Sequence, residues 1–483
     1  MVKNISLNQQ VFLGLRYNTS AKIFEALFTV FYGLFMARML GPSVFGVLAM
    51  ASVFTGISAL LTDFGTGDAI IRHDEEKTDS KFLSSIFWLN TLIGLSVAII
   101  FVLFSGMIAN FFGHQIIQEI IIFNSINIIF SAMANVPRSL IRKKMDFRSI
   151  FYQRLIILPA SGVVGVIMVF NGFGIWSIVA QQIIMTTVGT ILFIYFSRWI
   201  PSFVLNRQHI REIFHFSSYL SATKFLNYFT KKGDLFLIGK FLGDYELGIY
   251  SKGYQLTVKM LKTINGIIIG VLFPSISIIK DNKKKLRSIF IDVSKISFTI
   301  YGFIFLIGLF YSEQLVNLVL GIKWSELAPL IPIFLLLALF FALSSIASHF
   351  LKALGETKIL FNIVIYTSFF TLLAFVIGMN WGIVGVATGY LFATILLSVT
   401  AIYKSLEKLE IPLTNYLFIF NKELLVFFIS ALFMKFFIEN VFYHSQIGQL
   451  LAGIIFASLL QFLYHFYSNT FLFRSAKTFL FSK

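Results

Sequence analysis

The chain alternates long apolar runs with short segments rich in charged residues, Gly or Pro. A helix needs about 20 mainly apolar residues to cross a bilayer, and the runs meet that length without the alternation of a membrane β-barrel. The pattern therefore predicts an all-α polytopic membrane protein with about 14 transmembrane helices. The expected spans are 17–37, 44–71, 82–104, 115–137, 149–170, 174–197, 213–239, 247–278, 288–311, 326–351, 359–379, 382–402, 418–439 and 445–468.

The composition also indicates a membrane protein. Of the 483 residues, 57% are hydrophobic and 13% are charged, and the mean hydropathy is +0.85. A soluble domain carries about 25% charged residues, which it needs to cover its surface. The composition therefore excludes a soluble enzyme, a disordered protein and a fibrous protein. The connections between spans are too short to hold a folded domain outside the membrane.

Basic residues indicate which ends of the spans face the cytoplasm. With the N-terminus inside, 26 of the 39 Lys and Arg residues fall in cytoplasmic segments and 3 in outer loops. Because Lys and Arg collect on the cytoplasmic side, both termini are expected there. The first helix is expected to be retained rather than cleaved as a signal peptide. The net charge of +17 is attributed to contact with anionic lipid, so no nucleic-acid partner is expected.

A short motif recurs about 200 residues along the chain. At an offset of 202, Arg38, Gly41 and Gly46 recur as Lys240, Gly243 and Gly248, and two later pairs of motifs match at offsets of 208 and 210. The matches predict two parallel six-helix repeats, a plan that transporters use for alternating access. Chance similarity between short glycine turns is the alternative. The expected domains are an N-terminal lobe at 1–198, a C-terminal lobe at 199–403, and two added helices with a cytoplasmic tail at 404–483.

Four motifs with glycines and charges lie near the ends of predicted spans. They are Ala37–Met50, Asp63–Arg72, Asn135–Arg148 and Gly382–Ala387. Together they resemble the oligosaccharide flippases of the polysaccharide transporter family, over a region from about residue 12 to 402. Flippases of this kind serve O-antigen, colanic acid and other exopolysaccharides. The resemblance implies a MATE-like fold with two lobes in a V around a central cavity, as in multidrug antiporters and lipid II flippases.

The family resemblance also implies a function and a location. The implied protein flips polyprenyl-pyrophosphate-linked oligosaccharides from the cytoplasmic to the outer leaflet by alternating access, for cell-surface polysaccharide biosynthesis. The implied setting is a bacterial inner membrane, with an archaeal plasma membrane as the alternative. The implied partners are the lipid-linked glycan, membrane lipid, H+ or Na+ as a coupling ion, a polysaccharide polymerase and glycosyltransferases. The alternative function is a cation-coupled multidrug antiporter of the same superfamily.

Several basic side chains fall inside the predicted spans. Ionisable residues in the membrane are costly and usually face a bundle interior or a wet cavity. Spans seven and eight each hold two lysines seven residues apart, which places each pair on one face of an α-helix. Clustered ammonium groups in such a cavity would bind a pyrophosphate. The predicted cationic cavity consists of Lys22, Arg154, Lys224, Lys231, Lys252 and Lys259.

Snorkelling is the alternative for lysines near the end of a span. A lysine within about two helical turns of a span end can place its ammonium among the lipid headgroups. For Lys232, Lys262 and Lys295 both interpretations are open.

One acidic residue lies in the first predicted span. Glu25 follows Lys22 by three residues, so the two share one helical face. Glu25 is expected to neutralise Lys22; alternatively, it binds a proton or sodium ion that couples transport to an ion gradient. An antiporter would use such an acid as well, so Glu25 does not separate the two functions. The excess of lysine favours the flippase, because cationic drugs require an acidic cavity.

The sequence offers no catalytic machinery. It contains no Cys, its seven His lack metal-site spacing, and no Walker motif is present. A polymerase or ligase acting on the same glycans would present a large outer loop with a nucleophile and a base, whereas the outer connections are short. We therefore expect a transporter with no catalytic residue, no metal and no cofactor.

Overall fold

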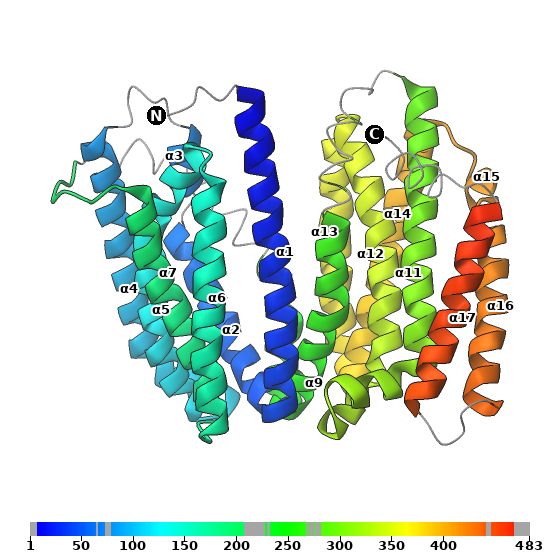
Figure 1. The fold of residues 1–483 in the computed structure, drawn as a ribbon, viewed down its shortest axis with the longest axis horizontal. Coiled ribbons are helices and arrows are strands. Elements are labelled where there is room, and N and C mark those ends of the chain that lie inside the picture. Colours follow the sequence, from blue (N-terminus) through cyan, green and yellow to red (C-terminus); the bar gives the residue numbers. More distant parts are fainter. Residues whose placement is uncertain are drawn as a thin grey trace. The chain divides into compact units, whose positions relative to one another are not determined.

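The protein is almost entirely helical. The computed structural model describes residues 7–63, 66–72, 79–206, 228, 232–266, 269, 276, 282–440 and 446–467. Within these ranges there is no strand, which confirms the predicted all-α fold. The chain divides into two compact units, Met1–Gly248 and Ile249–Lys483, coloured from blue to green and from green to red (Figure 1).

The first unit is a bundle of long helices. It contains α1 (Leu7–Leu40), α2 (Pro42–Asp63), α3 (Thr66–Arg72), α4 (Ser80–Phe112), α5 (Ile116–Lys143), α6 (Phe147–Phe170) and α7 (Trp176–Ser197). Helices α4 and α5 pack along each other, α7 packs against α5 and α6, and α1 packs against α6 (Figure 1). Beyond α7, residues 232–241 are helical, and α9 (Asp244–Tyr254) continues from this unit into the second.

Local sequence signals set the ends of these helices. Asp79 precedes α4, and its side chain accepts a hydrogen bond from the backbone N–H of Phe82 at 2.6 Å. The same helix ends at Gly113, whose φ of 76° lies in the left-handed region that a residue without a Cβ adopts readily. Asp146 caps α6 in the same way, through the N–H of Ser149 at 3.2 Å. Helices α6 and α7 begin and end within two residues of the predicted spans 149–170 and 174–197, whereas α4 extends eight residues beyond the predicted end at 104, and the predicted span 44–71 contains both α2 and α3.

A buried polar network fixes α3 to the bundle. The side-chain amides of Asn90 on α4 and Asn135 on α5 both donate to the hydroxyl oxygen of Thr66, each at 3.0 Å. All three side chains are buried. Since a buried polar group without a partner is costly, the three residues stabilise one another only when α3, α4 and α5 lie together. The network therefore fixes the position of α3 against α4 and α5.

The second unit surrounds one buried helix. It contains the π-helical segment η2 (Gln255–Lys259), α11 (Lys283–Val319), η3 (Ile322–Leu327), α12 (Leu330–Ala353), α13 (Thr357–Gly378), η4 (Met379–Trp381), α14 (Gly382–Leu409), α15 (Leu413–Phe418), α16 (Asn421–Asn440) and α17 (Gln446–Tyr467). Helix α12 packs against α11 and α14, and it buries residues on all sides, among them Phe334, Leu337 and Phe350. A helix that is apolar all round is expected to be buried in this way.

The last two long helices pack on α11. The ring of Phe298 on α11 lies 5.7 Å from that of Phe427 on α16, centroid to centroid, and Gly302 leaves room for the same ring. The hydroxyl of Tyr311 donates to the carbonyl of Met434 on α16 at 3.3 Å. A small residue facing a large ring allows two helices to approach closely, as is common in membranes. The two added helices are thus an integral part of the second unit.

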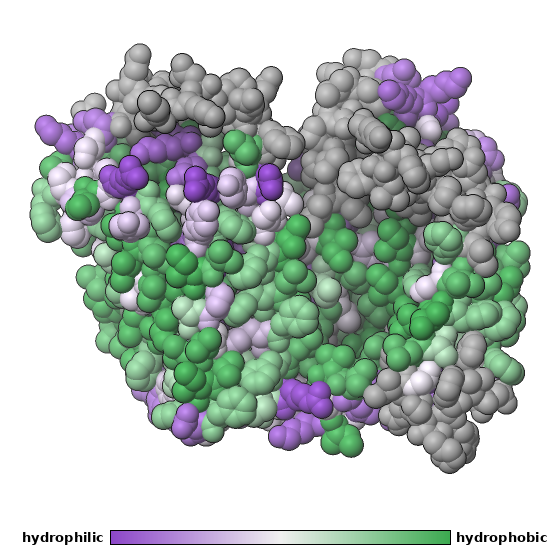
Figure 2. Space-filling model, viewed as in Figure 1, coloured by the Kyte–Doolittle hydropathy of each residue, from purple (hydrophilic) through white to green (hydrophobic). Residues whose placement is uncertain are grey.

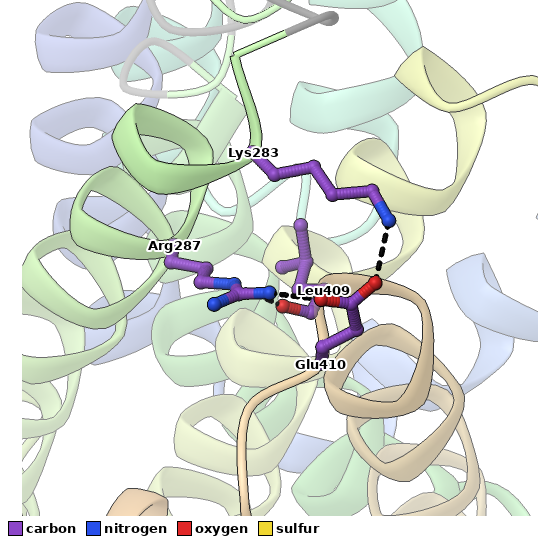
Figure 3. A network of polar contacts seen from close by, with 4 residues as sticks. All are labelled: Lys283, Arg287, Leu409 and Glu410. Carbon is purple, nitrogen blue, oxygen red and sulfur yellow. Dashed lines mark hydrogen bonds and ion pairs between the residues drawn. The ribbon is translucent and has the colours of Figure 1, made fainter.

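A polar contact ties the start of α11 to the end of α14. Lys283 Nζ lies 2.6 Å from Glu410 Oε1, and the guanidinium of Arg287 bonds to both Glu410 and the carbonyl oxygen of Leu409 (Figure 3). Glu410 has a φ of 52°, a left-handed conformation that ends α14. The contact fixes the point at which the chain leaves α14 for the added helices.

The helices have the lengths that a bilayer requires. Ten helical stretches among the described residues are long and apolar enough to cross a membrane, one of which comprises α13 and α14 together. On the face shown in Figure 2, a hydrophobic zone lies between hydrophilic margins. These observations confirm a multi-span membrane protein. The total of about 14 spans stays a prediction, because parts of 213–239 and 247–278 lie outside the described residues.

Candidate functional site

In the first unit, two glycines bring α1 close to α6. An added side chain at Gly162 would collide with the ring of Phe28, and one at Gly165 would collide with the hydroxyl of Tyr32. Small residues at one face of a membrane helix allow a neighbouring backbone to approach. The polar residues of both helices therefore lie within reach of each other.

Arg154 on α6 pairs with Glu25 on α1. Arg154 Nη1 lies 3.3 Å from Glu25 Oε1, and the two side chains are 29% and 40% exposed. The expectation that Glu25 neutralises Lys22 is wrong, because the approach of α6 supplies an arginine as the partner. Lys22 is exposed and has no ion pair with another described residue. Roles for Lys22 and Arg154 in substrate binding, and for Glu25 in ion coupling, stay predictions.

In the second unit, Lys252 and Lys259 lie in different environments. Lys252 on α9 is 2% exposed, whereas Lys259 is exposed. The segment Gln255–Lys259 between them is π-helical, with hydrogen bonds to the fifth residue rather than the fourth. Seven residues therefore no longer equal two helical turns, and Lys252 and Lys259 do not share one face of an α-helix as predicted. Short π-helical segments are frequent at functional sites.

The other two lysines of the predicted cavity lie outside the described residues. Lys224 and Lys231 belong to the predicted seventh span, in which only residue 228 and the part from residue 232 onward are described. The cationic cavity as a whole therefore stays a prediction.

Lys262 lies among aromatic rings, which the sequence did not reveal. Its ammonium donates a hydrogen bond to the hydroxyl of Tyr254 at 2.9 Å and lies 3.7 Å from the ring centroid of Phe341 on α12. The ring of Tyr254 stacks on that of Tyr390 on α14, at 6.2 Å and an interplanar angle of 18°. The aromatic partners come from helices far apart in sequence, so local spacing carried no signal for this arrangement.

The aromatic cluster around Lys262 has a definite chemical capacity. Lys262, Tyr254, Phe341 and Tyr390 are all partly exposed. An ammonium held over an aromatic face is stabilised by the ring and keeps donors for an anionic oxygen. Flat aromatic faces also offer stacking surfaces for the apolar face of a sugar ring. Among the described residues there is no group of three or more His, Cys, Asp or Glu side chains that could hold a metal ion.

Known proteins resemble this chain over most of its length. The lipopolysaccharide biosynthesis protein WzxC of Escherichia coli is 25% identical over 400 residues, which are 81% of this chain and 80% of the relative. The succinoglycan biosynthesis transport protein ExoT of Rhizobium meliloti is 24% identical and covers 88% of this chain and 86% of its own length. The teichuronic acid biosynthesis protein TuaB of Bacillus subtilis is 23% identical and covers 74% of each chain.

Solved structures share the fold. The lipid II flippase MurJ in an inward closed conformation aligns with a TM-score of 0.67 at 19% identity, over 93% of this chain and 98% of its own. An inward-facing MATE multidrug transporter aligns with a TM-score of 0.61 at 15% identity, over 79% of this chain and 94% of its own. The expected MATE-like fold is therefore confirmed. The family model described as polysaccharide biosynthesis protein matches residues 35–329, more than half of the chain, so the protein belongs to this family.

Proposed function

We propose that the protein flips lipid-linked oligosaccharides across the membrane for the synthesis of a cell-surface polysaccharide. The observation that carries the proposal is the similarity to WzxC, ExoT and TuaB, whose alignments include 81%, 88% and 74% of this chain. Their names concern lipopolysaccharide, succinoglycan and teichuronic acid, which are different glycans. The feature that such substrates can share is the lipid carrier and its phosphate link rather than one particular sugar.

The substrate we propose is a polyprenyl-pyrophosphate-linked oligosaccharide, moved from the cytoplasmic to the outer leaflet by alternating access. A pyrophosphate requires cationic partners, and a ligand that must leave again is suited to mobile ammonium groups. Lys262, hydrogen-bonded to Tyr254 in the second unit, has this chemistry. The predicted cationic residues Lys22, Arg154, Lys224, Lys231, Lys252 and Lys259 are further candidates.

We place the protein in a bacterial inner membrane with both termini in the cytoplasm. The distribution of Lys and Arg along the sequence supports this orientation. A proton or sodium ion is proposed as the coupling ion, and a polysaccharide polymerase and glycosyltransferases as functional partners. The reaction is transport, so no catalytic residue is assigned.

The alternative of a cation-coupled multidrug antiporter receives less support. Likeness to the MATE transporter at 15% identity concerns the fold and not the cargo. Cationic drugs require acidic partners. The described candidate positions in the second unit are basic rather than acidic: Lys252, Lys259 and Lys262.

The test is flipping in proteoliposomes. A polyprenyl-pyrophosphate oligosaccharide with a terminal N-acetylglucosamine is loaded in one leaflet, and its arrival in the other is read with a membrane-impermeant lectin. We expect movement with the wild-type protein and a large loss when Lys224, Lys231, Lys252 and Lys259 are all replaced by Met. The matched control replaces the exposed Lys284 and Lys285 by Met, which removes positive charge at the start of α11 and should leave movement unchanged.

Each outcome has a separate meaning. If the wild-type and the fourfold-substituted protein move the lipid-linked oligosaccharide equally, the flippase is supported and these lysines are removed from the site. Absence of movement, together with proton- or sodium-driven efflux of an organic cation, contradicts the flippase and favours the antiporter.

A further inference from the structure

A carboxylate is buried where the added helices meet α11. Glu423, in the first turn of α16, is 1% exposed. Its Oε1 atom lies 3.1 Å from Lys295 Nζ on α11 and accepts a hydrogen bond from the hydroxyl of Tyr464 on α17, also at 3.1 Å. Three helices thus converge on one carboxyl oxygen.

The second oxygen of the same carboxylate has no partner among the described residues. Glu423 Oε2 is buried, and none of these residues donates a hydrogen bond to it. A buried carboxylate oxygen without a donor has lost its hydration and has gained no hydrogen bond in return, which is unfavourable. Such a buried oxygen is a binding position for a proton.

The charges around Glu423 are unbalanced. Asp292 lies one helical turn before Lys295 on α11, so the single ammonium is near two carboxylates. Among the described residues Tyr464 on α17 also contacts Glu423, and Lys422, the preceding residue on α16, has an exposed side chain. With both acids ionised, Asp292, Glu423 and Lys295 together carry one excess negative charge. One bound proton neutralises it.

Further unpartnered polar atoms occur on the same three helices. They are Ser297 Oγ on α11, Ser430 Oγ on α16 and Gln461 Nε2 on α17, all in buried side chains. Buried polar atoms usually have partners, and those without one need an explanation such as a bound water or a second conformation. The interface of α11, α16 and α17 is therefore polar in places without being fully satisfied.

We propose that Glu423 is a proton-binding site, at which a proton and the ammonium of Lys295 compete for the carboxylate. With Glu423 ionised, Lys295 and Tyr464 hold α16 and α17 against α11. When a proton binds at Oε2, the carboxyl becomes neutral and the attraction of Lys295 is lost. The Lys295 side chain is 29% exposed, so its ammonium can turn towards water or lipid headgroups. The packing of the added helices thereby becomes dependent on proton binding.

A proton fits this position better than a metal cation. A sodium ion or a divalent ion needs several oxygen ligands, whereas one unpartnered carboxylate oxygen suffices for a proton. The neighbouring ammonium repels any additional metal cation. No cluster of three or more His, Cys, Asp or Glu side chains occurs in the described part of the chain.

The proton itself can be observed by infrared spectroscopy. The full-length protein in lipid nanodiscs is titrated with acid, and the C=O stretch of protonated carboxyl groups is recorded. We expect a buried carboxyl band in the wild-type protein that is absent in Glu423→Gln. The control Glu407→Gln removes an exposed acid that is bridged to Lys404 on the surface, and it should leave the band in place.

The helix packing is measured separately, by distances between two spin labels. The chain contains no Cys, so Ile300→Cys on α11 and Ile455→Cys on α17 give two exposed, unique labelling positions. As the pH falls, we expect a smaller fraction of wild-type molecules to have the short distance between the two labels that reflects close packing of α17 on α11. Glu423→Gln should show the acid-state distances at every pH, and Lys295→Gln should show them already near neutral pH.

The proposal is overturned by either of two results. One is a wild-type infrared titration identical to that of Glu423→Gln. The other is a distance distribution that does not change with pH. If Glu423→Gln fails to fold, the exchange Glu423→Lys with Lys295→Glu keeps an ion pair in the same place and supplies the second variant. Both measurements use no substrate, so their outcome is independent of the flipping assay.

Discussion

Gly46 and Gly248 make equivalent contacts, each with the backbone of the helix that carries the other. Gly46 on α2 packs on the backbone carbonyl of Asp244, and Gly248 on α9 packs on the backbone carbonyl of Pro42. Position 244 is 202 residues after 42, as 248 is after 46. Such a reciprocal contact is what two copies of one motif form around a local two-fold axis. It gives the sequence repeat a physical meaning, because neither position has space for a side chain.

The first prediction concerns this contact. Gly46→Val should destabilise the protein by about 1–3 kcal/mol, because the new side chain must push the α9 backbone away. The measurement is the midpoint of thermal unfolding in detergent. Gly106→Ala is the control: the nearest atom to its added Cβ lies 3.7 Å away, and it should have little effect. Equal stability of Gly46→Val and the wild-type protein would contradict the close packing.

The pair Arg154–Glu25 should contribute little to stability. Both side chains are partly exposed, and the coupling of such pairs is typically below about 1 kcal/mol. A double-mutant cycle with Arg154→Ala and Glu25→Ala, followed by chemical unfolding, measures it. If Arg154 binds substrate, Arg154→Lys should retain stability and lose flipping activity. A parallel loss of both in Arg154→Lys would argue for a structural role instead.

Lys262 should contribute to substrate binding beyond its effect on folding. Lys262→Met keeps the length of the side chain but removes the charge, which typically costs about 1.5–3 kcal/mol of binding to an anion, or roughly 10- to 100-fold. Flipping rates over a range of substrate concentrations measure the effect. Tyr254→Phe, which removes the hydroxyl that accepts from Lys262, should reduce activity less. A Lys262→Met protein with wild-type rates would exclude Lys262 from the site.

Acid should loosen the connection between α14 and α15. The pKa of Glu410 is lowered from its usual 4.5, first by the hydrogen bond from Lys283 and then by the charges of Lys283 and Arg287. A group with a lowered pKa stabilises the fold at higher pH, and this contribution is lost as the pH falls below 4.5 through the folded-state value. The protection factors of the amides around Glu410, which are the intrinsic exchange rates at each pH divided by the observed rates, should fall in that range. Glu410→Gln should show faster exchange at neutral pH and no such acid dependence.

The sequence predicted the positions of the helices better than it predicted which charged side chains pair with each other. The start of α4 at Ser80, capped by Asp79, lies two residues from the predicted start at 82, whereas its end at Phe112, before Gly113, lies eight residues beyond the predicted end at 104. The intramembrane charges Glu25 and Lys295 were also visible in the sequence. Their partners, Arg154 and Glu423, are more than 100 residues away, and no local spacing indicates which helices approach each other.

The sequence by itself determined that this is a multi-span helical membrane protein, because membrane insertion depends on the apolar length of each segment. It also revealed the repeat, because glycine recurs at the positions where two backbones come into contact. The tertiary structure alone decided the environments of the charges. The π-helical segment Gln255–Lys259 changes the register between Lys252 and Lys259, and rings from α9 and α12 contact the ammonium of Lys262. Electrostatic energy depends on distances in space and on burial, and both are set only when the helices pack.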